Sequence, residues 1–336
     1  MTLGVLALFV LMAYGQEKKF ALYSVAFYNM ENLFDTIHDE GKNDYEYLPN
    51  GTNQWNTMKY KAKLKNMSEI LSLLSTDKLP MGPAIIGVSE IENYRVLEDI
   101  LKQPALADRG YQYVHYEGED QRGVDCAFFY NPKLFELTNS KLVPYVYIND
   151  TIHKTRGFLI ASGNIAGEKM HFIVNHWPSR AAASPARERA GEQVRAIKDS
   201  LLREDSAAKI VIMGDMNDDP MDKSMAVALG AKRKPADVGP TDLYNPWWDT
   251  LKKGYGTLMY KGKWNLFDQI VFTGNLLGTD RSTLKFYKHE IFRRDFMFQK
   301  EGKYKGYPKR TQAGGVWLNG YSDHLPTIIY LIKEMK

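Results

Sequence analysis

Short apolar runs that end in polar residues recur along the whole of this chain, and they limit the folds open to it. Seven of them have the length and the β-branched or aromatic content of buried strands. They are residues 22–28, 84–88, 124–130, 170–174, 209–213, 268–272 and 327–332. Apolar residues at helical spacing from Tyr60 to Leu74 predict a helix, and Ser184 and Pro185 supply a cap and first-turn proline for another reaching about Leu202. We expect an α/β or α+β protein.

The 336 residues suit one large domain, because no repeat, long linker or low-complexity segment interrupts them. Residues 230–240 and 301–312 are interpreted as excursions from one fold, so we expect a single domain over residues 16–336. With 44% hydrophobic and 25% charged residues, the composition argues against a disordered, collagen-like or polytopic membrane protein. A single cysteine, Cys126, excludes an intramolecular disulfide and a cysteine-based zinc site, so oxygen or histidine must hold any metal.

The first fifteen residues resemble a secretory signal peptide. Their apolar run is followed by Ala13-Tyr14-Gly15, a small-x-small cleavage pattern, and then by polar Gln16. We expect cleavage near Gly15 and Gln16 and export to the periplasm or the cell exterior, without stable membrane insertion because the run is too short. The alternative is a buried N-terminal strand or helix, which the absence of lysine and arginine from the start of the chain favours.

Positive charge is concentrated in the second half of the chain. Residues 1–168 hold 16 Lys and Arg against 21 Asp and Glu, and residues 169–336 hold 28 against 19. The net charges of −5 and +9 suggest that an anionic partner binds the C-terminal half.

Polar residues with catalytic chemistry follow the predicted strands at seven places. They are Asn29 with Glu31, Glu90, Asp125, Asn175 with His176, Asp215 with Asn217, Asp268, and Ser322 with Asp323 and His324. Each taken alone is more typical of a helix cap or a turn. Asp125 could also simply pair with Arg122 or Arg180.

In combination, these residues resemble the endonuclease/exonuclease/phosphatase superfamily, the DNase I-like metal-dependent phosphoesterases, and among them a secreted bacterial-type member. The most diagnostic segments are GDMN at 214–217 and SDH at 322–324, with VSEIEN and NHW preceding them in the expected order. The resemblance spans residues 24–331. It implies a four-layer α/β sandwich in which two mixed β-sheets pack face to face between flanking helices, with the site at one rim.

The resemblance also implies a divalent cation, Mg²⁺ or Mn²⁺ with Ca²⁺ as a further option, which agrees with the oxygen ligands that hard cations prefer. Glu90 would ligate it, Asn29 would contribute nearby, and Asp323 would lie beside it. Glu92 competes with Glu90, but the apolar run that ends at Val88 aligns Glu90 with the family position.

The catalytic roles come from the same resemblance. Asp215 would align or deprotonate the attacking water, Asn217 would orient phosphate or nucleophile, and His176 would donate to a phosphate oxygen. His324 would contact the scissile phosphate, with its tautomer set by Asp268. Whether Asp215 or His324 is the general base stays open.

Peripheral segments bear on the substrate. Asn175, Arg122 and Arg180 are candidate substrate contacts. Residues 281–310 hold 10 Lys and Arg against 3 Asp and Glu together with seven aromatics, which could bind phosphates and stack on bases, or could instead fill the core beneath a solvated face.

We therefore expect a monomeric phosphodiester hydrolase acting on DNA or RNA. The alternative is a phosphatase or phosphodiesterase of small phosphoesters, inositol-phosphate-like or a phospholipid headgroup. An inactive binding relative would lack at least one residue of the proposed catalytic set, and none is missing.

Overall fold

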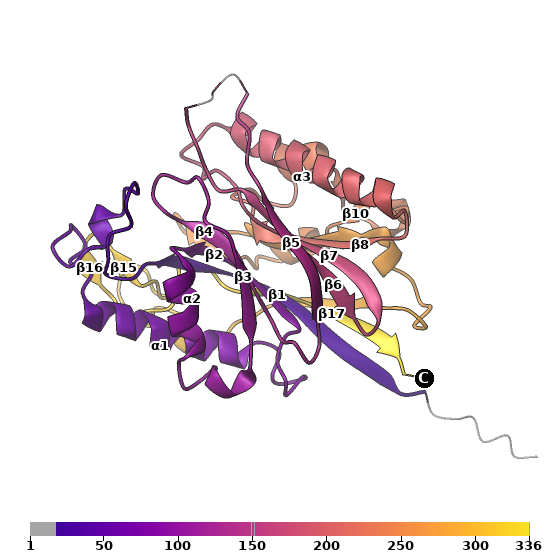
Figure 1. Ribbon diagram of the computed structural model, residues 1–336, viewed down its shortest axis with the longest axis horizontal. Coiled ribbons are helices and arrows are strands. Elements are labelled where there is room, and N and C mark those ends of the chain that lie inside the picture. The colour runs from indigo at the N-terminus through magenta and orange to yellow at the C-terminus, as the bar shows by residue number, and fades with distance from the viewer. Residues whose placement is uncertain (1–17, 149, 151, 336) are drawn as a thin grey trace, which may run out of the picture.

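The computed structural model describes residues 18–148, 150 and 152–335, and two large mixed sheets form its centre (Figure 1). In spatial order, the six-stranded sheet contains β14 (Lys285–Ile291), β17 (Thr327–Glu334), β1 (Phe20–Leu33), β2 (Ile85–Ile91), β4 (Asp125–Tyr130) and β3 (Gln112–His115). The seven-stranded sheet contains β5 (Glu136–Val143), β6 (Phe158–Ile165), β7 (Glu168–His176), β8 (Lys209–Asp215), β13 (Asp268–Thr273), β10 (Leu243–Tyr244) and β9 (Ala231–Lys232). The central pairs β1 with β2 and β7 with β8 are parallel, and so is the edge pair β9 with β10.

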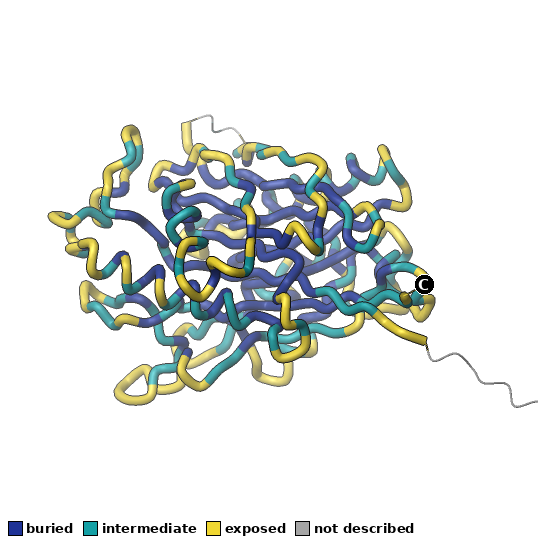
Figure 2. Tube along the Cα trace, turned by 60° about the horizontal axis from the view of Figure 1, so that its bottom comes forward, coloured by how far each residue is buried: buried dark blue, intermediate teal, exposed yellow. Residues whose placement is uncertain are grey.

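The two sheets pack face to face, and helices cover their outer faces. In β1, Val25 and Phe27 belong to the core between the sheets, whereas Ala26 and Tyr28 belong to the core beneath the helices, as the two-residue period of a strand requires. The helices α1 (Thr57–Leu73) and α2 (Tyr94–Leu101) pack on the six-stranded sheet, and α3 (Ser184–Glu204) packs on the seven-stranded sheet (Figure 1). The result is a four-layer α/β sandwich whose strands are the most buried part of the chain (Figure 2).

The remaining elements are short. Two hairpins, β11 (Leu258–Tyr260) with β12 (Lys263–Asn265) and β15 (Gln312–Ala313) with β16 (Val316–Trp317), lie outside the main sheets. The short helical segments are η1 (Tyr45–Tyr47), η2 (Ala107–Arg109), η3 (Ser224–Leu229), η4 (Pro235–Asp237), α4 (Trp248–Lys252), η5 (Gly274–Leu276) and η6 (Asp295–Met297). Within the described ranges, every helix is too short or too polar to cross a bilayer.

The predicted elements agree closely with the structure. All seven apolar runs lie in strands of the two large sheets, and the two predicted helices are α1 and α3. The prediction that Ser184 caps α3 was wrong: Ala183 occupies the N-cap position, and the Ser184 hydroxyl donates to Glu188 inside the first turn. The predicted signal peptide, residues 1–15, lies outside the described residues.

Six strands of the two large sheets were not predicted, namely β3, β5, β6, β9, β10 and β14, and for two of them the reason is clear. β6 is interrupted by small and polar residues, Ser162, Gly163 and Asn164, that obscure its apolar pattern. β14 lies at the edge of its sheet and is only half-buried, so its sequence looks like a charged surface segment.

Candidate active site

Strand register gathers the predicted catalytic residues at one end of both sheets. In the parallel pair β7 and β8, His176 lies opposite Asp215, and in the antiparallel pair β8 and β13, Asp215 lies opposite Asp268. In the other sheet, Asn29 of β1 lies opposite Ser89, next to Glu90 in β2. The Asn29 amide nitrogen then bridges the sheets, since it donates to Glu90 Oε1 (3.1 Å) and to Asp215 Oδ2 (3.0 Å).

Local backbone irregularities turn these side chains toward the site. The register between β1 and β2 shifts after Asn29, and the register between β2 and β4 shifts between Ser89 and Ile91. Glu90 has a φ of 59° and Asn217 a φ of 51°, in the left-handed region that non-glycine residues rarely adopt. Such strain persists only where the surrounding structure imposes it, and it is frequent at functional sites.

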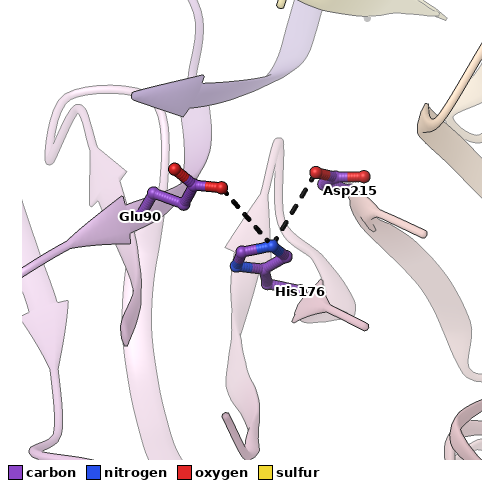
Figure 3. A group of neighbouring side chains, drawn as sticks. All are labelled: Glu90, His176 and Asp215. Atoms are coloured by element: carbon purple, nitrogen blue, oxygen red, sulfur yellow. Dashed lines mark ion pairs between the residues drawn. The ribbon is translucent and has the colours of Figure 1, made fainter. Parts of the chain in front are cut away.

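Glu90, His176 and Asp215 form the centre of the site (Figure 3). His176 Nε2 lies 3.6 Å from Glu90 Oε1 and 3.8 Å from Asp215 Oδ2. Burial of the Asp215 carboxyl raises its pKa to about 7, with Asp268 and Glu90 adding to the rise and His324 opposing it. Burial lowers the pKa of His176 well below its usual range, and Arg156 and Arg122 lower it further, so its imidazole is neutral.

A second histidine, His324, lies close to Asp215. His324 Nδ1 donates to Asp268 Oδ2 at 2.7 Å, and Nε2 lies 3.8 Å from Asp215 Oδ2. Burial favours the neutral imidazole, but the carboxylates of Asp268 and Asp215 outweigh it and raise the pKa of His324 well above its usual range. The site therefore holds one neutral and one cationic imidazole near the same carboxylate oxygen, Asp215 Oδ2.

A network of buried charges borders this centre. Arg310 donates from Nε to Glu31 Oε1 (2.8 Å) and from Nη2 to Asp323 Oδ2 (3.0 Å). The fully buried Lys63 of α1 donates to the Thr311 hydroxyl (2.5 Å) and the Tyr321 carbonyl (2.7 Å), and so holds the chain on both sides of the β15–β16 hairpin. Neither Lys63 nor Arg310 received an individual role from the sequence, because the contacts of Lys63 with Thr311 and Tyr321, and that of Arg310 with Glu31, join residues more than two hundred positions apart.

The donor set at the centre fits a hard cation. Glu90 and Asp215 offer carboxylate oxygens within 4.8 Å of His176, and Asn29 contacts both carboxylates. Neither carboxylate is paired with a lysine or arginine among residues 18–148, 150 and 152–335. Asp215 is buried and Glu90 is partly buried, and within the described part of the chain their close basic neighbours are histidines, so the two carboxylates are suited to a divalent cation. Asp323 Oδ1 is 3.9 Å from His324 Nε2 but is also held by Arg310.

A cavity of about 490 Å³ opens above these residues. Glu90, His176, Asp215, Asn217 and His324 line it, together with a basic wall formed by Arg122, Lys154 and Arg156. Asp120 and Glu119 pair with these three basic side chains. Arg122 therefore lies where the sequence placed it, at the candidate substrate site.

Arg156 and Lys154 were missed, because nothing in their sequence context resembles a motif. Arg156 is buried and donates to Asp120 Oδ2 (3.1 Å) and to the Trp177 carbonyl (2.7 Å), while its Nε has no hydrogen-bond partner among the described residues. An unpaired buried donor on the wall of a cavity is available to an anionic ligand.

Two predicted substrate contacts have other roles. Asn175 is fully buried, and its side chain donates to the Ile173 and Met213 carbonyls, so the prediction that it binds substrate was wrong. It precedes His176 on the same strand and therefore points to the opposite face. Arg180 lies outside the cavity lining, where it pairs with Asp218, Asp219 and Asp222 and stacks on Phe267.

Burial and side-chain contacts show which of the other acidic residues near the predicted site belong to it. Glu92 is buried away from the cavity and accepts from the Asp35 backbone, so Glu90 is the glutamate at the site. Asp35 pairs with Arg95. Asp125 contacts His115 and the Gly118 backbone, so it pairs with neither Arg122 nor Arg180.

The basic segment 281–310 divides into two parts. Its first part forms β14. Phe286 in this strand and Phe292 directly after it pack into the core, as expected if the aromatic residues of the segment fill the core. Its last part approaches the active site, since Arg310 bonds Asp323 and Glu31.

Solved structures with the same architecture are numerous. The chain superposes with a TM-score of 0.58 and 15% identity on an endonuclease/exonuclease/phosphatase family protein from Bacteroides thetaiotaomicron, covering 95% of this chain and 98% of that one. A mannosyl-6-phosphatase from the same organism gives a TM-score of 0.56 at 14% identity, with coverages of 92% and 99%. TDP2 from D. rerio, in complex with a single-strand DNA product, gives a TM-score of 0.53 at 14% identity, with coverages of 93% and 99%. At these identities the likeness establishes the fold alone.

No curated protein matches the chain significantly. The family model described as Endonuclease/Exonuclease/phosphatase family matches residues 24–333, which includes every residue of the site described above. The chain therefore belongs to the endonuclease/exonuclease/phosphatase family, whose members hydrolyse phosphoester bonds.

Proposed function

We propose that this protein is a divalent-metal-dependent phosphodiester hydrolase, acting as an exported nuclease on DNA or RNA. The observation that carries the proposal is the grouping of Glu90, His176, Asp215 and the His324–Asp268 pair beneath a cavity with a basic wall. Hydrolysis of a phosphodiester needs a base for water, donors for the phosphate oxygens and neutralisation of negative charge, and this grouping supplies all three.

Glu90 and Asn29 would hold the cation, which we propose to be Mg²⁺ or Mn²⁺, with Asp323 close by; Ca²⁺ has the same ligand preference. When bound, the cation would neutralise charge on the phosphate oxygens.

Asp215 is the residue we assign as general base. In the reaction, a water oxygen bonds to phosphorus, the bond from phosphorus to the leaving oxygen breaks, and the leaving oxygen takes up a proton. A carboxyl whose pKa is about 7 can accept the proton of the water near neutral pH. His324 is held protonated by Asp268, so it is suited to donate to phosphate rather than to accept a proton. Neutral His176 and Arg156 are the further donors.

The test is hydrolysis by the purified chain of single- and double-stranded DNA, RNA and a panel of small phosphate esters, with Mg²⁺, Mn²⁺ or EDTA. Asp215→Asn is the inactive control, because it keeps the size of the side chain but cannot accept a proton. Metal-dependent cleavage of polymer that is absent in the control would support a nuclease. Failure to cleave any ester with any of these metals would exclude the proposal.

A small phosphoester is the second candidate substrate. Arg122, Lys154 and Arg156 line the same cavity of about 490 Å³ as the catalytic residues, and this cavity could enclose a compact anionic substrate. The structural relative described as a mannosyl-6-phosphatase adds a plausible substrate class. Release of phosphate from small esters with polymer left intact would favour this candidate over the nuclease.

Export and a monomeric state are also part of the proposal. Both are open to direct measurement: N-terminal sequencing of the mature protein tests cleavage near Gly15 and Gln16, and sedimentation tests the monomer. Retention of Met1 and the following residues on the mature chain would argue against export.

A further inference from the structure

A second cavity, of about 660 Å³, adjoins the active site. It lies between the β11–β12 hairpin and residues 299–308, and Arg310 and Asp323 form part of its lining. The hairpin is attached directly to the catalytic segment, because Leu258 pairs with His324. A group bound in this cavity would therefore be next to the scissile phosphate.

Tyrosines dominate the open part of this cavity. Tyr260 and Tyr304 are 62% and 50% exposed, although burial of an aromatic ring is favourable. Tyr304 and Tyr307 meet edge to face with ring centroids 5.3 Å apart, and the Tyr307 hydroxyl accepts from the Gly262 backbone across the cavity. The cavity is thus a built aromatic site whose two walls are joined.

Basic side chains accompany the rings. Lys261 Nζ is 5.3 Å from the Tyr260 ring centroid, and Lys303 Nζ is 5.5 Å from that of Tyr304. Both lysines line the cavity, and neither forms an ion pair within the part of the chain that the structure describes. Planar aromatic faces flanked by cations favour a ligand with an aromatic body and a negative charge.

A basic pocket of about 390 Å³ follows on the far side of Gln299, which lines both cavities. Arg293, Arg294, Lys300 and Lys305 line this pocket against a single carboxylate, Asp295. The two lysines are exposed and unpaired among the described residues, so they are free to bind a phosphate.

We propose that the aromatic cavity holds a base of a polynucleotide strand adjacent to the scissile phosphate, and that the next backbone phosphate binds in the basic pocket. The inference rests on the proposed nuclease function and specifies its substrate. The aromatic cavity adjoins the active site and shares Gln299 with the basic pocket. In a nucleic acid strand one base branches from the sugar that joins two successive phosphates, so a base site between two phosphate sites suits one nucleotide and the phosphate that follows it. A small phosphoester would leave the basic pocket unused, and an apolar tail would leave the lysines unexplained.

Binding of a fluorescein-labelled single-stranded oligonucleotide to the full chain, followed by anisotropy in EDTA, tests the proposal without any hydrolysis. Tyr260→Ala and Tyr304→Ala should each weaken binding by about 5-fold or more, since stacking on an aromatic side chain contributes about 1–3 kcal/mol per base. Tyr287→Ala is the matched control, because Tyr287 is 52% exposed on β14 and lines neither cavity. With an abasic oligonucleotide of the same length, the two tyrosine variants should bind like the unmodified protein.

The basic pocket is tested by salt dependence. Lys300→Glu and Lys305→Glu should each reduce the slope of log affinity against log salt concentration by about one, because each removes one phosphate contact. Lys169→Glu is the control and should leave the slope unchanged, since Lys169 is exposed near the start of β7, at the end of the strand away from His176. Equal weakening of normal and abasic strands by the tyrosine variants, or no weakening of either, would overturn the proposal. If the protein cleaves polymer but the tyrosine variants bind the oligonucleotide as the unmodified protein does, only the proposed base site is rejected. If binding depends on the tyrosines but no polymer is cleaved, only the nuclease activity is rejected.

Discussion

Replacement of Asp215 by asparagine should stabilise the metal-free protein at alkaline pH while abolishing its activity. The Asp215 carboxyl is 2% exposed, and its burial raises the pKa from 3.8 to about 7. Between these values the folded protein binds a proton that the unfolded chain does not. Stability therefore falls as pH rises through this range, and the loss is complete above about pH 7.

The magnitude follows from the same two values. A pKa raised from 3.8 to about 7 corresponds to a loss of about 4 kcal/mol of folding free energy at about pH 8. Asparagine removes this penalty, but it cannot accept from both the Asn217 backbone (2.9 Å) and the Asn29 amide (3.0 Å), so about 1–1.5 kcal/mol of hydrogen bonding is lost. The net expected gain is about 2–3 kcal/mol at about pH 8, and close to zero at about pH 5, where only about a third of the penalty has developed.

Urea unfolding in EDTA at these two pH values measures the effect. Asp108→Asn, at an exposed carboxylate, is the control and should change little at either pH. Added Mg²⁺ should stabilise the unmodified protein at about pH 8 more than it stabilises Asp215→Asn, because the cation takes over the missing charge compensation. An Asp215→Asn protein no more stable than the unmodified one at about pH 8 would refute the reasoning.

Three further perturbations separate chemistry, binding and folding. His324→Ala should lower kcat by about 10²-fold or more while the circular dichroism spectrum is unchanged, and a near-normal rate would remove His324 from the mechanism. Arg122→Ala should raise KM by about 5-fold with little change in kcat, since Arg122 is half-exposed on the basic wall; an unchanged KM would place the substrate elsewhere. Asn175→Ala should lower the free energy of unfolding by about 2–3 kcal/mol, because its buried carbonyl partners lose their donor; a large fall in KM or kcat without destabilisation would restore Asn175 to the substrate site.

Local pattern was sufficient to locate the main elements. The runs in β1, β2, β4, β7, β8, β13 and β17 were recognised because buried central strands are nearly continuous in apolar residues. The candidate catalytic residues were identified because they follow those runs in a characteristic order. The edge strand β14 was missed, since half-burial leaves little apolar pattern to detect.

Two pairs of nearby residues show that the local sequence pattern does not decide which side chain lines the cavity. Asn175 and His176 are adjacent and equally polar, yet one is a buried structural amide and the other lines the cavity. Glu90 and Glu92 differ in the same way, and the irregular backbone around Glu90 decides which of them reaches the site. Both members of each pair are polar and lie in the same short stretch of sequence. Only the path of the backbone decides which of the two side chains reaches the cavity.

The amino-acid sequence by itself determined the family, the positions of the central strands and the set of candidate site residues, because these depend on residue type and order along the chain. The tertiary structure alone brought Arg156 into the lining of the cavity and joined Arg310 to Glu31, 279 positions away in the chain. It also decided the charge states of His176 and His324, which differ because one faces arginines and the other carboxylates. Burial and electrostatic environment are properties of the folded chain, and residue order does not encode them locally.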